Sequence, residues 1–201
     1  MDLCGLMRTE SINKKKYILV IVDDYTRFGW VRFLRTKDET SEVIKKFIVL
    51  TQRAFNATVR SVRTDNGTEF VNKTLTTWFE SVGITHETSV PRSPQQNGVV
   101  ERRNRTLMEA ARTMLIFAKA PLFLWAEAVA TACYTLNRSL VHTLHRKTYY
   151  ELLKGKKPEL KYFRVFGSLC YPTNDYDDVG KLKAKADIGI FVGYAPSKKA
   201  Y

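Results

Sequence analysis

The stretch "SVRTDNGTEF", residues 61–70, ends a short β-prone run in an acid, an amide and a glycine. One interpretation is a tight turn, because Asp-Asn-Gly supplies residues that adopt the positive φ a turn needs. The other is a functional site, because open α/β sheets place their sites beyond the carboxyl ends of their strands. These ten residues leave both interpretations of Asp65 open, so the rest of the chain has to decide between them.

A second carboxylate, Glu101, follows Asp65 after 35 intervening residues, within "QQNGVVERRNRTL". Helical spacing from Gly98 to about Ala118 places Glu101 in the first turn of a helix. Charge complementarity with the helix dipole would account for an acid there, at about 0.3–1 kcal/mol. The preceding "SPQQNG", however, is a polar loop of the kind that often carries function.

One face of this predicted helix carries an acid followed by two arginines. Glu101, Arg105 and Arg112 share that face at positions i, i+4 and i+11, while Leu107 and Ala111 lie toward the core. An acid beside two bases on one face indicates a metal ligand next to a phosphate-binding stripe.

Alternating periodicities along the first 140 residues predict an α/β fold. Strands are expected at 17–22, 28–34, 58–63 and 84–88. Helices are expected at 38–55, 72–83, 98–118 and 121–138. The first two strands form a hairpin, the third joins through a helical crossover, and Thr40 or Ser41 caps the first helix.

The pattern changes after residue 140. The segment 146–164 holds seven basic residues against two acids and is interpreted as a basic connector. Short β-rich runs at 165–171 and 188–194 indicate a small β unit. The predicted organisation is therefore a core at 1–140, a connector at 141–164 and a β unit at 165–201 that is incomplete.

Composition narrows the class of partner and compartment. The chain has 201 residues and a formal net charge of +13, which favours polyanionic partners such as nucleic acid. The sequence has no run of 18 apolar residues and no signal-peptide pattern, and its three cysteines are far apart. We therefore expect an intracellular protein that is not secreted and does not use membranes. The three histidines do not combine with the cysteines at zinc-finger spacing.

Four segments carry a resemblance to a known family. "DLCG", "VRTDNGTEF", "PRSPQQNGVVERRNRTLMEAARTML" and "IGIFVGY" together resemble the integrase of copia-type LTR retrotransposons, within the retroviral integrase superfamily. The resemblance spans essentially the whole chain. It implies an RNase H-like catalytic core, with a five-stranded mixed sheet flanked by helices, followed by an SH3-like β unit.

The resemblance also implies a catalytic and metal-binding triad of Asp2, Asp65 and Glu101, with Asp2 on an opening strand near residues 1–8. Mg²⁺ (or Mn²⁺) would be the cofactor, since hard cations prefer carboxylate oxygens. The implied activity is DNA integration by polynucleotidyl transfer, in the nucleus or a cytoplasmic particle, by a homo-oligomer. Residues expected to contact DNA are Asn66, Gln95, Gln96, Asn97, Arg105 and Arg112.

Two other acids compete with the implied triad. Asp23 and Asp24 are adjacent at a strand end, but they fall in a hairpin turn, where Asp is an ordinary residue, so a structural role is favoured. Leu6 and Tyr149 each stand where the family usually has proline. Asp2 also has only Met1 before it, so a frayed strand is expected. The alternative function is therefore a catalytically inactive, DNA-binding remnant of a retrotransposon polyprotein.

Overall fold

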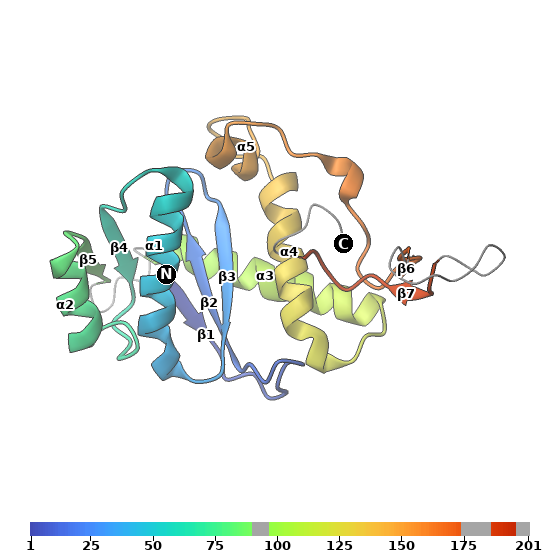
Figure 1. Ribbon diagram of the computed structural model, residues 1–201, viewed down its shortest axis with the longest axis horizontal. Coiled ribbons are helices and arrows are strands. Elements are labelled where there is room, and N and C mark those ends of the chain that lie inside the picture. The colour runs from blue at the N-terminus through green and yellow to red at the C-terminus, as the bar shows by residue number, and fades with distance from the viewer. Residues whose placement is uncertain (90–96, 174–185, 196–201) are drawn as a thin grey trace.

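The computed structural model describes residues 1–89, 97–173 and 186–195. Its main body has three layers, with a sheet between helices that cover its two faces (Figure 1). The sheet strands are β1 (Asp2–Cys4), β2 (Tyr17–Val22) and β3 (Gly29–Leu34), all antiparallel in the order β1-β2-β3. The two strands expected at 17–22 and 28–34 are thus confirmed to within a residue.

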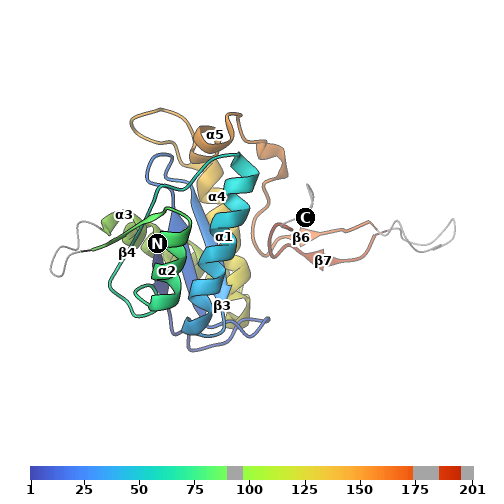
Figure 2. The same ribbon diagram turned by 60° about the vertical axis from the view of Figure 1, so that its left-hand side comes forward.

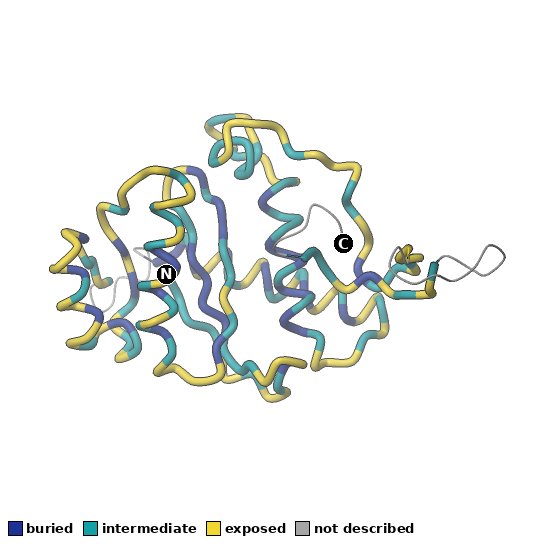
Figure 3. Tube along the Cα trace, viewed as in Figure 1, coloured by how far each residue is buried: buried dark blue, intermediate teal, exposed yellow. Residues whose placement is uncertain are grey.

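Alternation along β2 explains the layered core. Ile18 and Val20 pack with the helices on one face, whereas Leu19 and Ile21 pack on the other. Successive side chains of a strand point to opposite faces, so a continuous apolar run fits a strand covered on both sides. The buried residues accordingly concentrate along this strand and the helix faces against it (Figure 3).

The expected five-stranded mixed sheet is not one continuous ladder. β4 (Ser61–Thr64) and β5 (Thr85–Thr88) form a separate parallel pair. One contact between the two sheets is a hydrogen bond from the Met1 nitrogen to the carbonyl of Arg63.

One face of the sheet is covered by α1 (Thr40–Phe55), which follows the short 3-10 turn η1 (Lys37–Glu39), and by α2 (Lys73–Ser81). Glu39 occupies the N-cap of α1 without a side-chain cap bond, so the expected cap at Thr40 or Ser41 is wrong. Asn72 caps α2 by accepting a hydrogen bond from the Leu75 amide at 2.9 Å.

The other face is covered by α3 (Gly98–Phe117) and α4 (Trp125–Ser139), joined through the 3-10 turn η3 (Leu122–Leu124). The apolar face expected for α3 is buried, as Leu107, Ala111 and Leu115 show. Asn137 on α4 accepts from the Gly29 amide at 2.9 Å and donates to the Gly29 carbonyl at 2.8 Å. This two-way bond fixes α4 against the start of β3.

The basic segment 146–164 contains two short helical elements. It contains α5 (Tyr149–Lys154), capped by Thr148, and the 3-10 turn η4 (Leu160–Tyr162). Capping explains the helix, because the Thr148 hydroxyl accepts from the Glu151 amide at 3.1 Å. Its many bases are therefore distributed over ordered turns.

The last described residues form a small antiparallel pair, β6 (Leu169–Cys170) with β7 (Gly189–Ile190), which extends to one side of the main body (Figure 2). Phe166 nevertheless belongs to the core beside α3 and α4. A Cβ at Gly167 would lie 2.3 Å from the Cβ of Ala118, so the segment meets the end of α3 closely. This pair does not by itself show an SH3-like barrel.

Among the residues that the structure describes, no helix is both long and apolar enough to cross a bilayer.

Candidate active site

Asp2 lies on β1 with its side chain half-buried. Its strand position pairs with Val20 of β2, and its Oδ2 accepts a hydrogen bond from Asn104 Nδ2 on α3 at 2.8 Å. The frayed end expected from the sequence is not present, because Asp2 is in the ladder and the Met1 amine bonds to Arg63.

Asp65 directly follows β4, and its contacts confirm the turn interpretation of the opening stretch. Its Oδ1 accepts from the Gly67 amide at 3.0 Å, which makes an Asx turn. The adjacent Asn66 donates from Nδ2 to the Ser89 carbonyl at 2.8 Å and so ties the turn to the residue after β5. The turn chemistry therefore holds the Asp65 carboxylate at the strand end.

β1 and β4 contact each other at the start of β1. The Met1 nitrogen donates to the carbonyl of Arg63, two residues before Asp65, and Met1 is the neighbour of Asp2 in the chain. Asp2 on β1 and Asp65 directly after β4 are therefore carried by segments that contact each other.

Glu101 is in the first turn of α3 and is exposed. It stands three residues before Asn104, whose side chain reaches Asp2, so both lie on the helix face turned toward β1. Within residues 1–89, 97–173 and 186–195, no three His, Cys, Asp or Glu side chains are close enough to hold a metal ion. The three expected ligands therefore do not form a preassembled cluster.

The residues expected to contact DNA have different positions. Arg105 and Arg112 are exposed on α3. Asn97 is the N-cap residue of α3, only 6% exposed, so its side chain is not presented at the surface. Gln95 and Gln96 lie outside the described residues.

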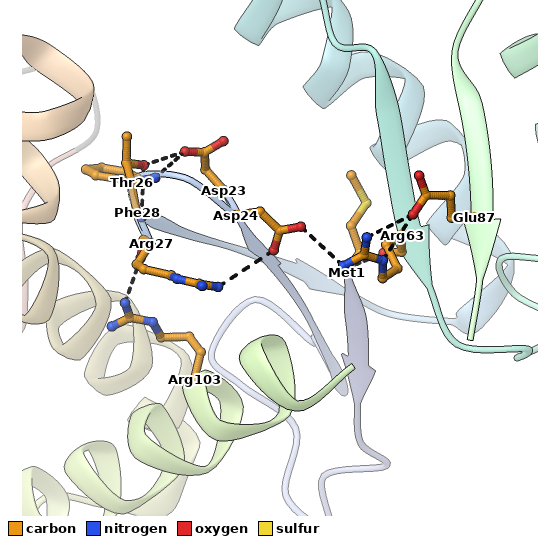
Figure 4. Close-up of polar contacts among 9 residues, drawn as sticks. All are labelled: Met1, Asp23, Asp24, Thr26, Arg27, Phe28, Arg63, Glu87 and Arg103. Atoms are coloured by element: carbon orange, nitrogen blue, oxygen red, sulfur yellow. Dashed lines mark hydrogen bonds and ion pairs between the residues drawn. The ribbon is translucent and has the colours of Figure 1, made fainter. Parts of the chain in front are cut away.

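Asp23 and Asp24 have contacts typical of a turn (Figure 4). Asp23 Oδ2 accepts from the Thr26 amide at 2.8 Å and from its hydroxyl at 2.6 Å. Asp24 lies 3.8 Å from Arg27 Nη1 and 3.4 Å from Arg63 Nη1. The structural role expected for Asp23 agrees with these bonds, and Asp24 links the hairpin to β4.

Sequence reasoning missed two residues. Asn104 holds Asp2, and its position three residues after Glu101 on the same helical face was the signal that could have found it. Arg103 is 9% exposed, although arginine is rarely buried, and nothing in the local pattern separates it from Arg102 and Arg105.

The chemistry of the donor set fits a hard divalent cation. Asp2 accepts a hydrogen bond from Asn104 through Oδ2, and Asp65 accepts one from the Gly67 amide through Oδ1. Carboxylate oxygens are what Mg²⁺ prefers, and Mg²⁺ commonly binds through one or two carboxylates and waters. Asp2 and Asp65 fit such an ion, and Glu101 is on the adjacent helix.

Comparison with protein families agrees with this arrangement. The integrase core domain family matches residues 1–94. The chain is 38% identical over 200 residues to the retrovirus-related Pol polyprotein from transposon TNT 1-94 of Nicotiana tabacum, covering 100% of this chain and 15% of that protein. It is 34% identical over 191 residues to the Pol polyprotein from transposon RE1 of Arabidopsis thaliana, covering 95% and 13%. The chain thus spans a small part of the length of these relatives.

Solved structures share the fold. The integrase catalytic core domain of HTLV-2, in complex with magnesium in a trimeric form, aligns with a TM-score of 0.53 and 22% identity, covering 76% of this chain and 95% of that one. An intasome of simian T-cell lymphotropic virus, in complex with the PP2A regulatory subunit B56 gamma, aligns with a TM-score of 0.58 and 20% identity, covering 92% and 65%.

The layered fold, the carboxylates at adjoining strand ends and these matches lead to one conclusion: the chain belongs to the retroviral integrase superfamily, as an integrase core of the kind found in copia-type retrotransposon Pol polyproteins.

Proposed function

We propose that this chain catalyses DNA integration, by a Mg²⁺-dependent (or Mn²⁺-dependent) polynucleotidyl transfer that joins retroelement 3′ ends to target DNA. The observation that carries the proposal is the placement of two carboxylates where β1 and β4 contact each other: Asp2 lies on β1, and Asp65 directly follows β4, whose Arg63 carbonyl accepts a hydrogen bond from Met1. Two acids held at adjoining strand ends by α3 and by an Asx turn suit metal-assisted phosphoryl transfer.

In this proposal Asp2 and Asp65 are the ligands that hold the cation, and Glu101 is the third. Bound divalent cations would supply activation of the attacking oxygen and stabilisation of the leaving oxygen. Asn104 keeps the Asp2 carboxylate oriented through its 2.8 Å bond. Glu101, which is exposed, would come into the ligand set by a rotamer change or a small shift of the first turn of α3.

The DNA path would follow the exposed face of α3. Arg105 and Arg112 lie there, one and three turns beyond Glu101. The net charge of +13 supports a polyanionic substrate, because each neutralised phosphate releases a counterion. Asn66, Gln95 and Gln96 remain proposed contacts with DNA. Asn97, which is buried, would instead have a structural role as the N-cap residue of α3.

The domain organisation, the oligomeric state and the cellular location are part of the same proposal. Residues 1–140 would be the catalytic core, 141–164 a basic connecting segment and 165–201 an SH3-like unit. A homo-oligomer would hold the two DNA ends, and the protein would be located in the nucleus or in a cytoplasmic particle.

A strand-transfer assay with Mg²⁺ and a labelled oligonucleotide of the element's DNA end tests the proposal. Asp65→Asn and Glu101→Gln should each abolish joining while leaving the thermal melting temperature near that of the parent chain. Glu109→Gln is the matched control, since Glu109 is an exposed acid on the same helix and should retain joining. Equal joining by Asp65→Asn and the parent would contradict the assignment.

A second candidate is a catalytically inactive DNA-binding protein. It is favoured by the lack of a three-ligand cluster among the described residues. The same assay distinguishes the two functions. If the parent chain binds DNA but joins no DNA ends at any Mg²⁺ or Mn²⁺ concentration, the inactive DNA-binding function is the correct one.

A further inference from the structure

A cleft separate from the acidic edge lies between the start of α3, the β2–β3 turn and the segment that leads into α5. Its volume is about 360 Å³. The residues along it that carry or can carry positive charge are Arg27, Arg102, Arg103 and His142. No acid belongs to the lining formed by the described residues, although Asp24 lies 3.8 Å from Arg27 Nη1, so the lining carries an excess of positive charge.

Arg103 is the central feature of this cleft. Its guanidinium donates from Nη2 to the Arg27 carbonyl at 2.7 Å and lies 4.8 Å from the centre of the Tyr149 ring. It is only 9% exposed, and within the described part of the chain it has no ion pair with a carboxylate. Burial lowers the pKa of this guanidinium. A buried charge without a counter-ion is costly, which points to an anion that the protein alone does not supply.

Arg102 adds a second charge at the mouth of the cleft. A Cβ placed on Gly98 would lie 3.0 Å from Arg102 Nη1, so this guanidinium folds over the first turn of α3. The start of a helix carries a partial positive charge, and a cation there is unfavourable unless an anion is present. No side chain caps this helix, since Asn97 makes no side-chain cap bond.

A hydrogen bond and an ion pair fix the position of Arg27 in the wall of the cleft (Figure 4). Arg27 has a left-handed backbone, φ 61°, which presents its carbonyl to Arg103, and its side chain is 3.8 Å from Asp24. On the opposite wall, an isolated bridge between Val141 and Thr148 closes the loop that carries His142.

We propose that this cleft binds a phosphate group, with Arg102 and Arg103 as its principal donors. Guanidinium groups suit phosphate because their N–H donors pair with its oxygens in a bidentate manner. The favoured source is a backbone phosphate of DNA, since the cleft begins at the same helical turn as Glu101. That source rests on the proposed function, whereas binding of free phosphate does not.

The first arm of the test uses inorganic phosphate and no divalent metal. The melting temperature of the parent chain is compared in phosphate and in chloride at matched ionic strength, beside Arg102→Gln and Arg53→Gln. Arg53 is an exposed arginine at the end of α1, away from the cleft, so its variant corrects for general salt effects. We expect phosphate to raise the melting temperature of the parent and of Arg53→Gln, and to raise that of Arg102→Gln by less than half as much.

Arg103→Met is a second variant that removes the buried charge. If it folds, it should lose the phosphate-dependent shift; if it does not, Arg102→Gln still decides the question. An equal phosphate-dependent rise in the parent, Arg53→Gln and Arg102→Gln would overturn the proposal.

The second arm measures binding of a short DNA duplex by fluorescence anisotropy in EDTA, over a range of salt concentrations. Arg102→Gln should lower the slope of log K against log salt by about one. A slope unchanged from that of Arg53→Gln, with the phosphate shift still lost, would assign the site to free phosphate. Because neither arm requires catalysis, a chain that fails to join DNA still tests the cleft.

Discussion

Asn104 Nδ2 on α3 donates a hydrogen bond to Asp2 Oδ2 on β1 at 2.8 Å. This bond joins the N-terminal half of α3 to β1 across 102 positions of sequence. The contact gives the N-terminal carboxylate a fixed orientation beside the helix that also carries Glu101. It connects the strand end to the helical layer through a side chain that has no charge of its own.

Replacing this amide should weaken metal use without unfolding the chain. For Asn104→Ala we expect the Mg²⁺ concentration at half-maximal strand transfer to rise by about 10–100-fold, as for other residues that orient a metal ligand. Thr113→Ala is the control, because Thr113 is on the same helix and its hydroxyl donates to the backbone carbonyl of Glu109 on that helix. A loss of joining that saturating Mg²⁺ cannot restore would argue against a positioning role.

Asp23 should contribute to the free energy of unfolding and not to metal binding. Its Oδ2 accepts two hydrogen bonds from Thr26, so Asp23→Ala should lower the free energy of unfolding by about 1–3 kcal/mol. Asp23→Asn retains an acceptor oxygen and should lose less. Denaturant unfolding measures both, and Mg²⁺ dependence of joining equal to that of the parent is the accompanying expectation.

Gly167 should be the position where the C-terminal segment docks. Gly155 and Gly167 both have positive φ, 70° and 82°, but a Cβ at Gly155 meets nothing within 4 Å, whereas one at Gly167 meets Ala118 at 2.3 Å. Gly155→Ala should cost about 1–2 kcal/mol from backbone strain alone. Gly167→Ala should cost more in thermal unfolding, and equal costs would show that the contact with Ala118 adds nothing.

His86 should give stability a dependence on pH. Burial lowers its pKa from the ordinary 6.5, beside the Thr64 hydroxyl at 2.9 Å and the Phe79 ring. Between the lowered folded value and 6.5 the unfolded chain binds more protons, so the free energy of unfolding rises with pH in that interval. The contribution is complete above 6.5 and is lost as pH falls through the folded value.

The matching measurement is denaturant unfolding from pH 7.5 down to 5 for the parent and for His86→Gln. The variant should show a shallower fall in stability over the acidic part of this range. Parallel curves for the two proteins would mean that His86 is not the group responsible.

Much of the local structure was determined by sequence alone. The short apolar run at 17–22 has the composition of a strand, and Leu107 and Ala111 mark the buried face of α3. Asp65 specifies its turn through a hydrogen bond from the Gly67 amide, two residues further along the chain. These features depend on neighbours in sequence, so periodicity and turn chemistry predict them.

Tertiary structure alone decided the features that join distant segments. The division of the sheet between β1 and β4, the bond from Asn104 to Asp2 and the burial of Arg103 under Tyr149 each depend on atoms far apart in the chain. No local pattern distinguishes Arg103 from Arg102, because what separates them is a helical rotation of about 100° relative to a turn and a helix elsewhere in the sequence. Local residue preferences set which elements form, whereas packing determines which side chains are brought together.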